Sequence, residues 1–550
     1  MHKLTIVGSG PTAIYTIAAL LDRKAPVDIS VIEREALSGT GMPFRTGEAD
    51  AIMLANIADI EIPPIRERFL EWVTALPPDV LAHFGLDRAL LTERSFLPRV
   101  LLGAWLRHSL ALLAAEARAA GHVLRIIKEA DVVDVVATAD GYRASFLQDG
   151  KLHATTSDSL VISTGHDWPL TDAPKEGYYA SPWPSSKLQA VGPCEVGVIG
   201  TSLSGIDAAL AIAAHHGTFT RAPDGSYSYA TDARGLTITL MSRKGLLPEA
   251  DFYCPLPYEP AVAATPERLA ALEARGEALT AQDLFDLLRD EITAMDPQYA
   301  ADMRLATIDL TEFPDRYFSP RIGRNQFTLA AANLAEVLAN QRSRTTVNWR
   351  YAILRSHELI GPFVPRLSDA EKALFNSYLK PVFIDNYAAV PPQTIARLLA
   401  LHRTDTLHVM ALGAEAQPVR HPGRNGATVA VAGNERHFDV LIDARGQQAM
   451  MLEDLPFPTL RGQLAGQGGD PVALDDALRP YGANGAPMQG LHLAAISFLL
   501  TDRPFVQGIT VSHEIGEAVA ESLCARLTET QGAGFRSHTR RLAAAAATAP

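Results

Sequence analysis

Lys3-Leu4-Thr5-Ile6-Val7-Gly8-Ser9-Gly10-Pro11-Thr12-Ala13 stands almost at the start of the chain, and a second apolar run, residues 27–32, ends in Glu33. The run before Gly8 predicts a strand buried in a parallel sheet, and residues 14–21 predict a helix without a breaker. The pattern G-x-G-x-x-A between a strand and a helix, followed by a strand that ends in an acidic residue, is typical of a dinucleotide-binding fold.

Each residue of this first motif has a physical task. Gly8 permits a tight turn, Gly10 lets the backbone approach a pyrophosphate, and Ala13 keeps the helix near the sheet. The helix N-terminus offers unpaired N–H groups to phosphates, and a carboxylate at Glu33 can accept hydrogen bonds from ribose hydroxyls. The alternative is that the glycines only shape the turn and Glu33 is a solvated charge. The expected cofactor contacts are Gly8, Gly10, Pro11, Thr12, Ala13 and Glu33.

A second motif of the same kind lies in the middle of the chain. Residues 195–200 predict a strand, Gly200-Thr-Ser202-Leu203-Ser204-Gly205 follows, and residues 206–214 predict a helix. Ser202 replaces the middle glycine and is small enough to allow a close approach. A serine-nucleophile turn, G-x-S-x-G, is excluded because residue 204 is serine. The expected contacts are Gly200, Ser202, Leu203 and Ser204, with an unliganded turn as the alternative.

The strand that follows this second helix ends in cations instead of a carboxylate. Residues 236–241 predict that strand, and Arg243 and Lys244 follow it. Residues 216–234, rich in Gly, Asp and Tyr, predict an inserted loop. Cations at this position favour a 2′-phosphate and therefore NADPH, with NADH as the other candidate. Two solvated surface charges are the alternative interpretation.

Composition limits the classes of function. The chain has 550 residues, 47% of them apolar, and a formal charge of -13, which disfavours nucleic-acid binding. Cys194, Cys254 and Cys524 form no C-x-x-C pair, which argues against a redox disulfide, a zinc site or an iron–sulfur cluster; no metal is expected. We expect a cytoplasmic protein, because we find no secretory signal and no uninterrupted membrane-length apolar stretch.

The order of motifs resembles bacterial FAD/NAD(P)-binding flavoproteins with two dinucleotide-binding folds, which are related to flavin-dependent N-hydroxylating and Baeyer–Villiger monooxygenases. The resemblance covers most of the chain, is strongest before residue 250 and is thin from about 260 to 375. It rests on the motifs at residues 8–13, 33, 41–44, 56, 96–99, 163–166, 200–205 and 242–248.

The resemblance implies an α/β fold with two Rossmann-like domains, for FAD and NAD(P), and helical insertions. It implies that Thr164 and Gly165 cross beside the cofactor and that Gly508 lies near the flavin ring. Arg99 matches a position near the cofactor or nicotinamide, with a surface salt bridge as an equal alternative. His166 is a weaker candidate base. The remaining expected flavin-side contacts are Gly41, Met42, Pro43, Phe44, Asn56 and, from the strand expected at 132–136, Val133.

The expected domains are an FAD-binding part at residues 1–190, an NAD(P)-binding domain with a helical insertion at 191–384, and the returning FAD-binding part with a C-terminal tail at 385–550. Some relatives carry a basic cluster where this chain has residues 386–392 without one, so the substrate could differ.

The leading hypothesis is a monooxygenase that is reduced by NAD(P)H and uses O₂ to hydroxylate a small molecule, in particular an amine nitrogen of an amino acid. One alternative is a dehydrogenase or oxidase that passes electrons to a partner or quinone. Another is a non-catalytic flavin-binding protein. No nucleic acid or membrane is expected as a partner, and a homo-oligomer is compatible with the sequence.

Overall fold

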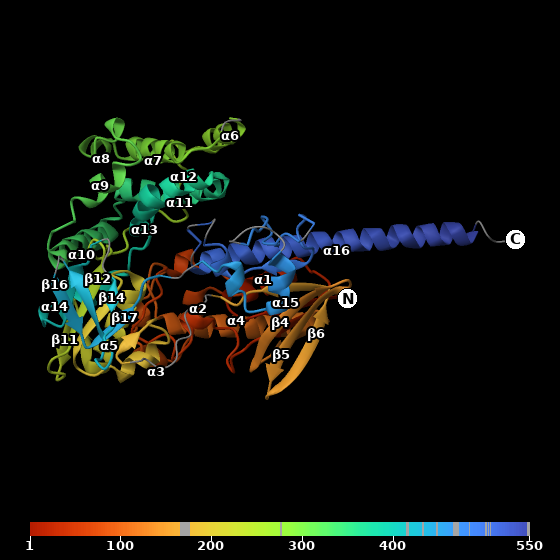
Figure 1. Ribbon diagram of the computed structural model, residues 1–550, viewed down its shortest axis with the longest axis horizontal. Helices are drawn as coiled ribbons and strands as arrows, with labels where there is room; N and C mark the ends of the chain where they lie inside the picture. The colour runs from red at the N-terminus through yellow and green to blue at the C-terminus, as the bar shows by residue number, and fades with distance from the viewer. Residues whose placement is uncertain are drawn as a thin grey trace.

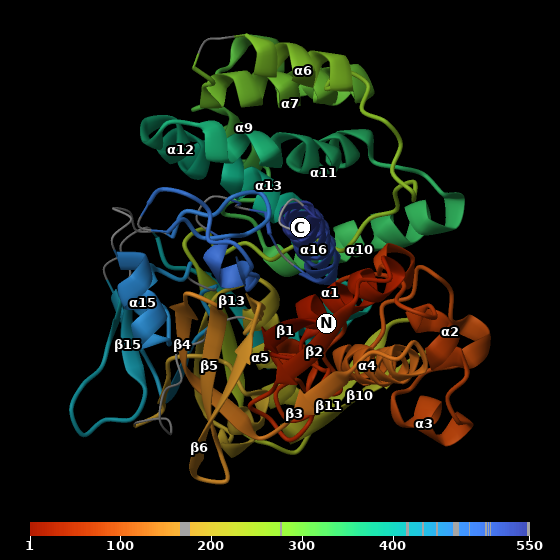
Figure 2. The same ribbon diagram turned by 90° about the vertical axis from the view of Figure 1, so that its right-hand side faces the viewer.

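Two parallel sheets and a layer of helices make up the molecule (Figures 1 and 2). The computed structural model describes residues 1–165, 176–275, 278–413, 417–431, 434–446, 449–465, 472–482, 484–500, 503, 505–506 and 508–546, with side chains up to residue 529. Within these residues, each five-stranded parallel sheet has helices on one face and a small antiparallel sheet on the other. The predicted fold class, α/β with two Rossmann-like units, is confirmed.

The first sheet has the strand order β18-β7-β1-β2-β3, with every pairing parallel. Its strands are β1 (His2–Val7), β2 (Val27–Ile32), β3 (Leu124–Ile127), β7 (Ser159–Ile162) and β18 (Leu491–Leu493). One face packs on α1 (Pro11–Asp22), α4 (Arg99–Ala119) and α16 (Gly508–Ala546). The other face packs on the antiparallel sheet of β4 (Ala130–Thr138), β5 (Gly141–Gln148) and β6 (Lys151–Ser157), and on α15 (Pro458–Leu464).

The second sheet repeats this arrangement with the order β13-β12-β9-β17-β8. Its strands are β8 (Tyr178–Tyr179), β9 (Glu195–Ile199), β12 (Thr237–Ser242), β13 (Leu407–Ala411) and β17 (Val440–Asp443). Helices α5 (Leu203–His216) and α14 (Pro392–Arg403) pack on one face. The three strands β14 (Pro418–Val419), β15 (Ala427–Val431) and β16 (Asn434–Phe438) pack on the other.

A helical layer stands over the sheets between β12 and α14, at the top of Figure 2. Buried side chains such as Phe285, Phe313 and Phe375 give it a hydrophobic core of its own. Its helices are α6 (Pro266–Ala274), α7 (Ala281–Met295), α8 (Pro297–Asp302), α9 (Phe313–Phe318), α10 (Gln326–Ser343), α11 (Asn348–Ile360), α12 (Asp369–Leu374) and α13 (Lys380–Tyr387). Of these, α10 packs on the core of the second sheet through Phe327, Ala330 and Val337.

Two parts of the chain differ from the sequence-based expectation. Residues 216–234, expected as a loop, contain the hairpin β10 (Gly217–Arg221) and β11 (Tyr227–Thr231), in which Tyr229 is buried and donates its hydroxyl to the carbonyl of Ala213 at 2.8 Å. β13 and β17 follow residue 385 yet join the second sheet, and β18 is the strand that returns to the first. Tertiary pairing, which local sequence does not encode, decides both differences.

Helix α4 is long and apolar enough to cross a membrane by composition alone, and it is the only such helix among the described residues. More than half of its most apolar window is buried inside the protein, as expected of a core helix. Its fully buried residues include Trp105, Leu106 and Leu113, which pack in the core beneath the first sheet.

Candidate functional site

The first glycine turn connects β1 to α1 and contains Gly8 and Gly10, and Gly41, from the segment after β2, packs against it. Gly8 has φ +93°, and a Cβ there would lie 2.5 Å from the carbonyl oxygen of Ser163, at the end of β7. Gly41 has φ +73°, and a Cβ there would lie 2.9 Å from Cδ of Pro11. A Cβ on Gly10 would meet only Cα of Gly41, at 3.6 Å. The protein therefore leaves open the space beside Gly10, the position that a pyrophosphate would approach.

Helix α1 begins directly after this turn. Gly10 is its N-cap and provides no side chain to cap it, and Pro11 occupies the first turn. The backbone N–H groups of Thr12 and Ala13 belong to that first turn, which an α-helix leaves without internal partners. Together with the helix dipole they form an anion-binding end, which fits a phosphate.

Glu33 lies at the end of β2, beside the turn. Its carboxylate accepts hydrogen bonds from the backbone N–H of Ser9 at 3.0 Å and of Glu35 at 2.9 Å. The hydroxyl of Ser9 donates to the same carboxylate and accepts from the N–H of Gly39 at 2.8 Å. Glu33 thus holds the turn and the segment after β2 together, and it occupies the end of the second strand, the position of the acidic residue in the dinucleotide-binding motif.

The segment after β2 continues along the expected flavin side. Met42, Pro43 and Phe44 form a short 3-10 helix that packs against α4; a Cβ on Gly103 would lie only 2.2 Å from the carbonyl oxygen of Phe44. The hydroxyl of Thr40 and Oδ1 of Asn56 are buried without a hydrogen-bond partner among the described residues. Buried polar atoms normally have partners, so these two fit a site that a polar cofactor completes.

The remaining residues expected beside FAD come from three other segments of the chain. Thr164 and Gly165 are exposed directly beyond β7, and the hydroxyl of Ser497 donates to the carbonyl of Gly165 at 3.4 Å. Val133 is the unpaired residue at a bulge in β4. Gly508, at φ +78°, begins α16. His166 lies outside the described residues.

The second glycine turn connects β9 to α5. Gly200 has φ +133°, and a Cβ on Gly205 would lie 2.2 Å from the carbonyl oxygen of Gly200, so the helix starts against the turn. Ser202 is the N-cap of α5 but its side chain makes no capping bond; Leu203 and Ser204 begin the helix. The helix start therefore presents unpaired N–H groups, as in the first motif.

The end of β12 lies beside this turn. The hydroxyl of Thr201 donates to the hydroxyl of Ser242 at 3.0 Å, which joins the turn to the residues that carry the two expected cations. Arg243 is exposed. Nζ of Lys244 lies 3.4 Å from the ring centroid of Phe318, and partial burial lowers its pKa. The structure thus places both cations at the carboxyl edge of the second sheet, where β12 ends.

Arg99 connects the two dinucleotide-binding units. It is the first residue of α4, and its guanidinium forms a salt bridge of 2.9 Å with Asp207 on α5. The two side chains are only 12% and 11% exposed, and burial is the main cause that raises the pKa of Asp207. The structure therefore shows Arg99 in an ion pair, as in the alternative interpretation, but one that is buried between the units.

The first unit, the loop after β12 and helix α11 meet at a junction that no sequence motif indicated. It contains Glu61, Asp251 and Glu358. Burial raises the pKa of all three, and mutual repulsion with Glu61 helps to raise that of Asp251 to about 7. Tyr258 donates a hydrogen bond to Glu61, and the guanidinium of Arg355 lies 4.6 Å from the ring centroid of Tyr258. No local motif marks these residues, because they come from three distant segments.

In the described part of the chain, no group of three or more His, Cys, Asp or Glu side chains is placed to hold a metal ion. The three cysteines are free thiols, and burial raises the pKa of each. Raised pKa values disfavour the thiolate, which is the reactive form of cysteine.

Comparison with known proteins agrees with this geometry. Residues 5–167 match the FAD-NAD(P)-binding family, and residues 265–387 match the YdhS-like middle domain, which corresponds to the helical layer. The uncharacterized protein YdhS of Escherichia coli K12 is 40% identical over 528 residues, which cover 95% of this chain and 97% of that protein.

Solved structures with a similar fold include N-hydroxylating enzymes. The Kutzneria sp. 744 ornithine N-hydroxylase KtzI and the Pseudomonas aeruginosa ornithine hydroxylase PvdA each give a TM-score of 0.53, at 14% and 13% identity, over 96% of this chain and 99% and 100% of theirs. The Erwinia amylovora cadaverine monooxygenase DfoA, bound to FAD, gives 0.50 at 12% identity, over 95% of this chain and 94% of its own. At such identities the likeness shows a shared fold.

Proposed function

Because the chain belongs to the YdhS family and contains an FAD/NAD(P)-binding domain, we propose that it is an FAD-dependent monooxygenase, reduced by NADPH, that hydroxylates an amine nitrogen of a small molecule. The observation that carries this proposal is the pair of glycine turns, each at a helix start, on two parallel sheets that the buried pair Arg99–Asp207 joins. Two such sites in one rigid arrangement suit a hydride transfer between two dinucleotides.

The proposed overall reaction balances without a metal or a further reductant. One amine, NADPH, O₂ and one proton give a hydroxylamine, NADP⁺ and water. When bound, FAD would supply the redox chemistry, namely hydride acceptance from NADPH and the reduction of O₂. The absence of a C-x-x-C pair from the sequence leaves no dithiol for a disulfide-reductase version of the reaction.

The residues of the chain itself would bind the two cofactors. The first turn, from Gly8 to Ala13, and Glu33 would hold the pyrophosphate and ribose of FAD. Thr40 and Asn56 would supply hydrogen bonds to polar atoms of FAD, since both have buried oxygens without a partner among the described residues. The second turn, at Gly200 and Ser202, would hold the pyrophosphate of NADPH.

The junction supports an amine as the substrate class. Three carboxyl groups with raised pKa values lie where the two units and the helical layer meet. Arg355 already pairs with Glu358, and Arg94 acts on both Glu61 and Asp251. An ammonium group bound beside Glu61 and Asp251 would offset the repulsion that remains between these two carboxyl groups. The likeness in fold to enzymes that act on ornithine and cadaverine agrees with this choice.

Anaerobic mixing of the purified, FAD-loaded protein with NADPH, followed by O₂ and an amine, tests the proposal. We expect NADPH to bleach the flavin absorbance and, with a substrate amine present, the hydroxylamine formed to equal the NADPH consumed. Reduction that yields only hydrogen peroxide with every amine would favour an oxidase, and transfer of the electrons to a quinone would favour a dehydrogenase. A flavin that neither NADPH nor NADH reduces would favour a non-catalytic flavin-binding protein.

A further inference from the structure

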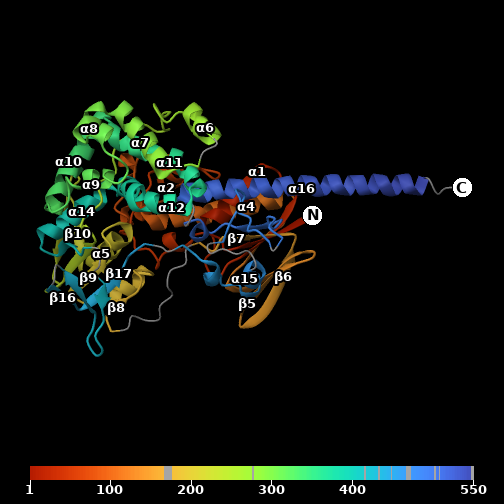
Figure 3. The same ribbon diagram turned by 45° about the horizontal axis from the view of Figure 1, so that its top comes forward.

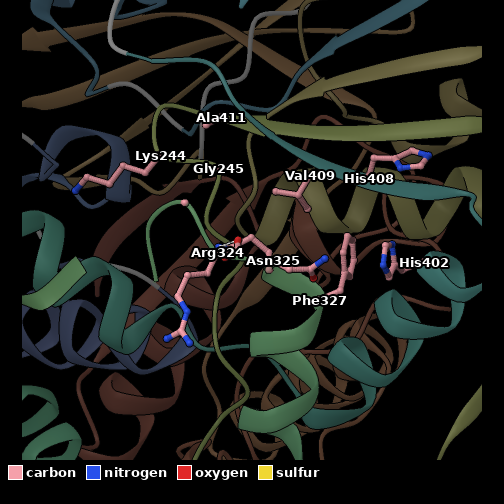
Figure 4. Close-up of a pocket in the computed structure, with 11 residues that line it drawn as sticks. Lys244, Gly245, Arg324, Asn325, Phe327, His402, His408, Val409 and Ala411 are labelled. Carbon is pink, nitrogen blue, oxygen red and sulfur yellow. Dashed lines mark hydrogen bonds between the residues drawn. The ribbon is translucent and has the colours of Figure 1, made fainter. Parts of the chain in front are cut away.

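A cavity of about 370 Å³ opens between the second sheet and the start of α10 (Figure 4). Lys244 and Gly245, after β12, and Val409 and Ala411, on β13, line one side; residues 323–327 of the helical layer line the other. Lys244 and Arg324 lie toward one end of the cavity, and Phe327, stacked on His402 at a centroid distance of 3.6 Å, lies toward the other. The cavity is large enough for a nucleoside.

The cationic end of this cavity lies beside the second glycine turn. Thr201 of that turn is bonded to Ser242, and the N–H of Gly413 donates to the carbonyl of Arg243 at 3.0 Å. The ends of β12 and β13 and the phosphate-binding turn therefore meet at one sheet edge. In a Rossmann fold the ribose nearest the adenine binds at the end of the second strand, which here is β12.

The side chain of Gln326 holds the turn that carries Arg324 at this sheet edge. The amide of Gln326 donates to the carbonyls of Arg321 at 2.9 Å and Arg324 at 3.1 Å. Its oxygen accepts from the N–H of Leu247 at 3.2 Å. The turn that carries Arg324 is thus bonded to the loop that follows Arg243 and Lys244.

The charges at this edge favour an anion. Arg243 and Arg324 are exposed and form no salt bridge with a carboxylate in the described part of the chain. The guanidinium of Arg324 donates only to the carbonyl of Pro320, at 3.2 Å. Lys244 also forms no salt bridge in the described part of the chain, although the carboxylates of Asp385 and Asp315 act on it electrostatically. In a chain with a formal charge of -13, cations from two segments at one cavity fit a phosphate.

We propose that Arg324, a residue of the helical layer, completes with Arg243 and Lys244 a site for the 2′-phosphate of NADPH. The inference rests on the proposed function and adds a role for the helical layer: it contributes to cofactor specificity. An Arg side chain is suited to this role because its planar fork can donate two parallel hydrogen bonds to one phosphate.

Equilibrium binding of 2′,5′-ADP and 5′-AMP to the FAD-loaded, full-length protein tests the site without turnover. The wild type should bind 2′,5′-ADP more tightly than 5′-AMP. Arg324→Ala should weaken 2′,5′-ADP binding about tenfold, as expected for one charge-assisted contact. Binding of 5′-AMP should stay unchanged, and Arg324→Lys should recover part of the loss.

Arg342→Ala is the matched control, because Arg342 lies in the last turn of α10, the helix that follows Arg324, and is also exposed. Equal losses for both ligands in Arg324→Ala, or no loss for 2′,5′-ADP, would overturn the inference, as would a wild type that binds neither ligand. A failure of the proposed function alone would give a different result. The preference for 2′,5′-ADP would still depend on Arg324, but NADPH would not reduce the flavin.

Discussion

The backbone angles and surroundings of single glycines distinguish those that the fold requires from one that leaves room for a ligand. Gly8 and Gly41 have positive φ and close neighbours, so the protein itself requires them. Gly10 has φ -72°, a value open to any residue, and free space around its Cβ position. Its sequence position in the motif and its open surroundings together point to a ligand that must approach the backbone.

We expect Gly10→Val to fold and to lose FAD, because the new side chain would enter the pyrophosphate path. FAD content by absorbance and the circular dichroism spectrum check both parts. Gly192→Val is the matched control, since Gly192 also lacks positive φ and has no atom within 4 Å of a Cβ. A Gly10→Val protein that purifies with a full complement of FAD would remove this turn from FAD binding.

The carboxyl group of Asp251 should make stability depend on pH. Its pKa is about 7 in the folded protein against an ordinary 3.8, so the folded state retains a proton that the unfolded chain releases between these values. The free energy of unfolding should therefore fall as pH rises from about 4 to 7. The full shift corresponds to about 4 kcal/mol, and partial solvent contact reduces our expectation to about 2 kcal/mol.

Asp251→Asn should remove this slope. The variant should match the wild type near pH 4 and be more stable at pH 8, as measured by urea unfolding across that range. If the free energies of unfolding of both proteins changed with pH in the same way, the pKa of Asp251 in the folded protein would be the ordinary value for an aspartate.

Among the elements, the pair α1 and α16 brings the C-terminal part of the chain back to the first sheet (Figure 3). The rings of Tyr15 and His513 meet edge to face at 5.1 Å, and Arg23 pairs with Glu517 at 2.6 Å, so the helices run parallel. Both N-termini therefore point the same way, and α16 starts at Gly508 on the side where α1 meets the glycine turn.

Gly516 sets how closely these helices approach. A Cβ there would lie 2.8 Å from the backbone N of Thr16 and 2.8 Å from Cβ of Tyr15. Gly516→Val should force the helices apart and cost about 1–3 kcal/mol in the free energy of unfolding, measured by urea denaturation. Gly462→Val, in α15 with no atom within 4 Å of a Cβ, should change stability little. Equal effects would show that helix propensity, not packing, determines the loss.

At the scale of the whole molecule, the buried pair Arg99–Asp207 holds the two dinucleotide-binding units in a fixed relation. Removal of one partner leaves the other charge buried without compensation. Asp207→Asn should therefore lower the free energy of unfolding by about 3 kcal/mol and slow reduction of the flavin by NADPH, with FAD content unchanged.

The exposed pair Arg366–Glu273 provides the control, because its side chains are 49% and 55% exposed. Glu273→Gln should change stability by less than about 1 kcal/mol. If Asp207→Asn had an effect as small as this, the buried pair would not determine the relation between the units.

The sequence by itself determined the two glycine turns, the strands and helices that flank them and the α/β class. These features depend on short-range chemistry: a buried apolar run, a positive φ and a close backbone approach each demand particular residue types a few positions apart. Only the tertiary fold brings β13 and β17 into the second sheet, pairs Arg99 with Asp207, places Glu61 near Asp251 and lines one cavity with Lys244 and Arg324. Those contacts join segments dozens to hundreds of residues apart, and packing and pairing between distant elements select them without leaving a local pattern.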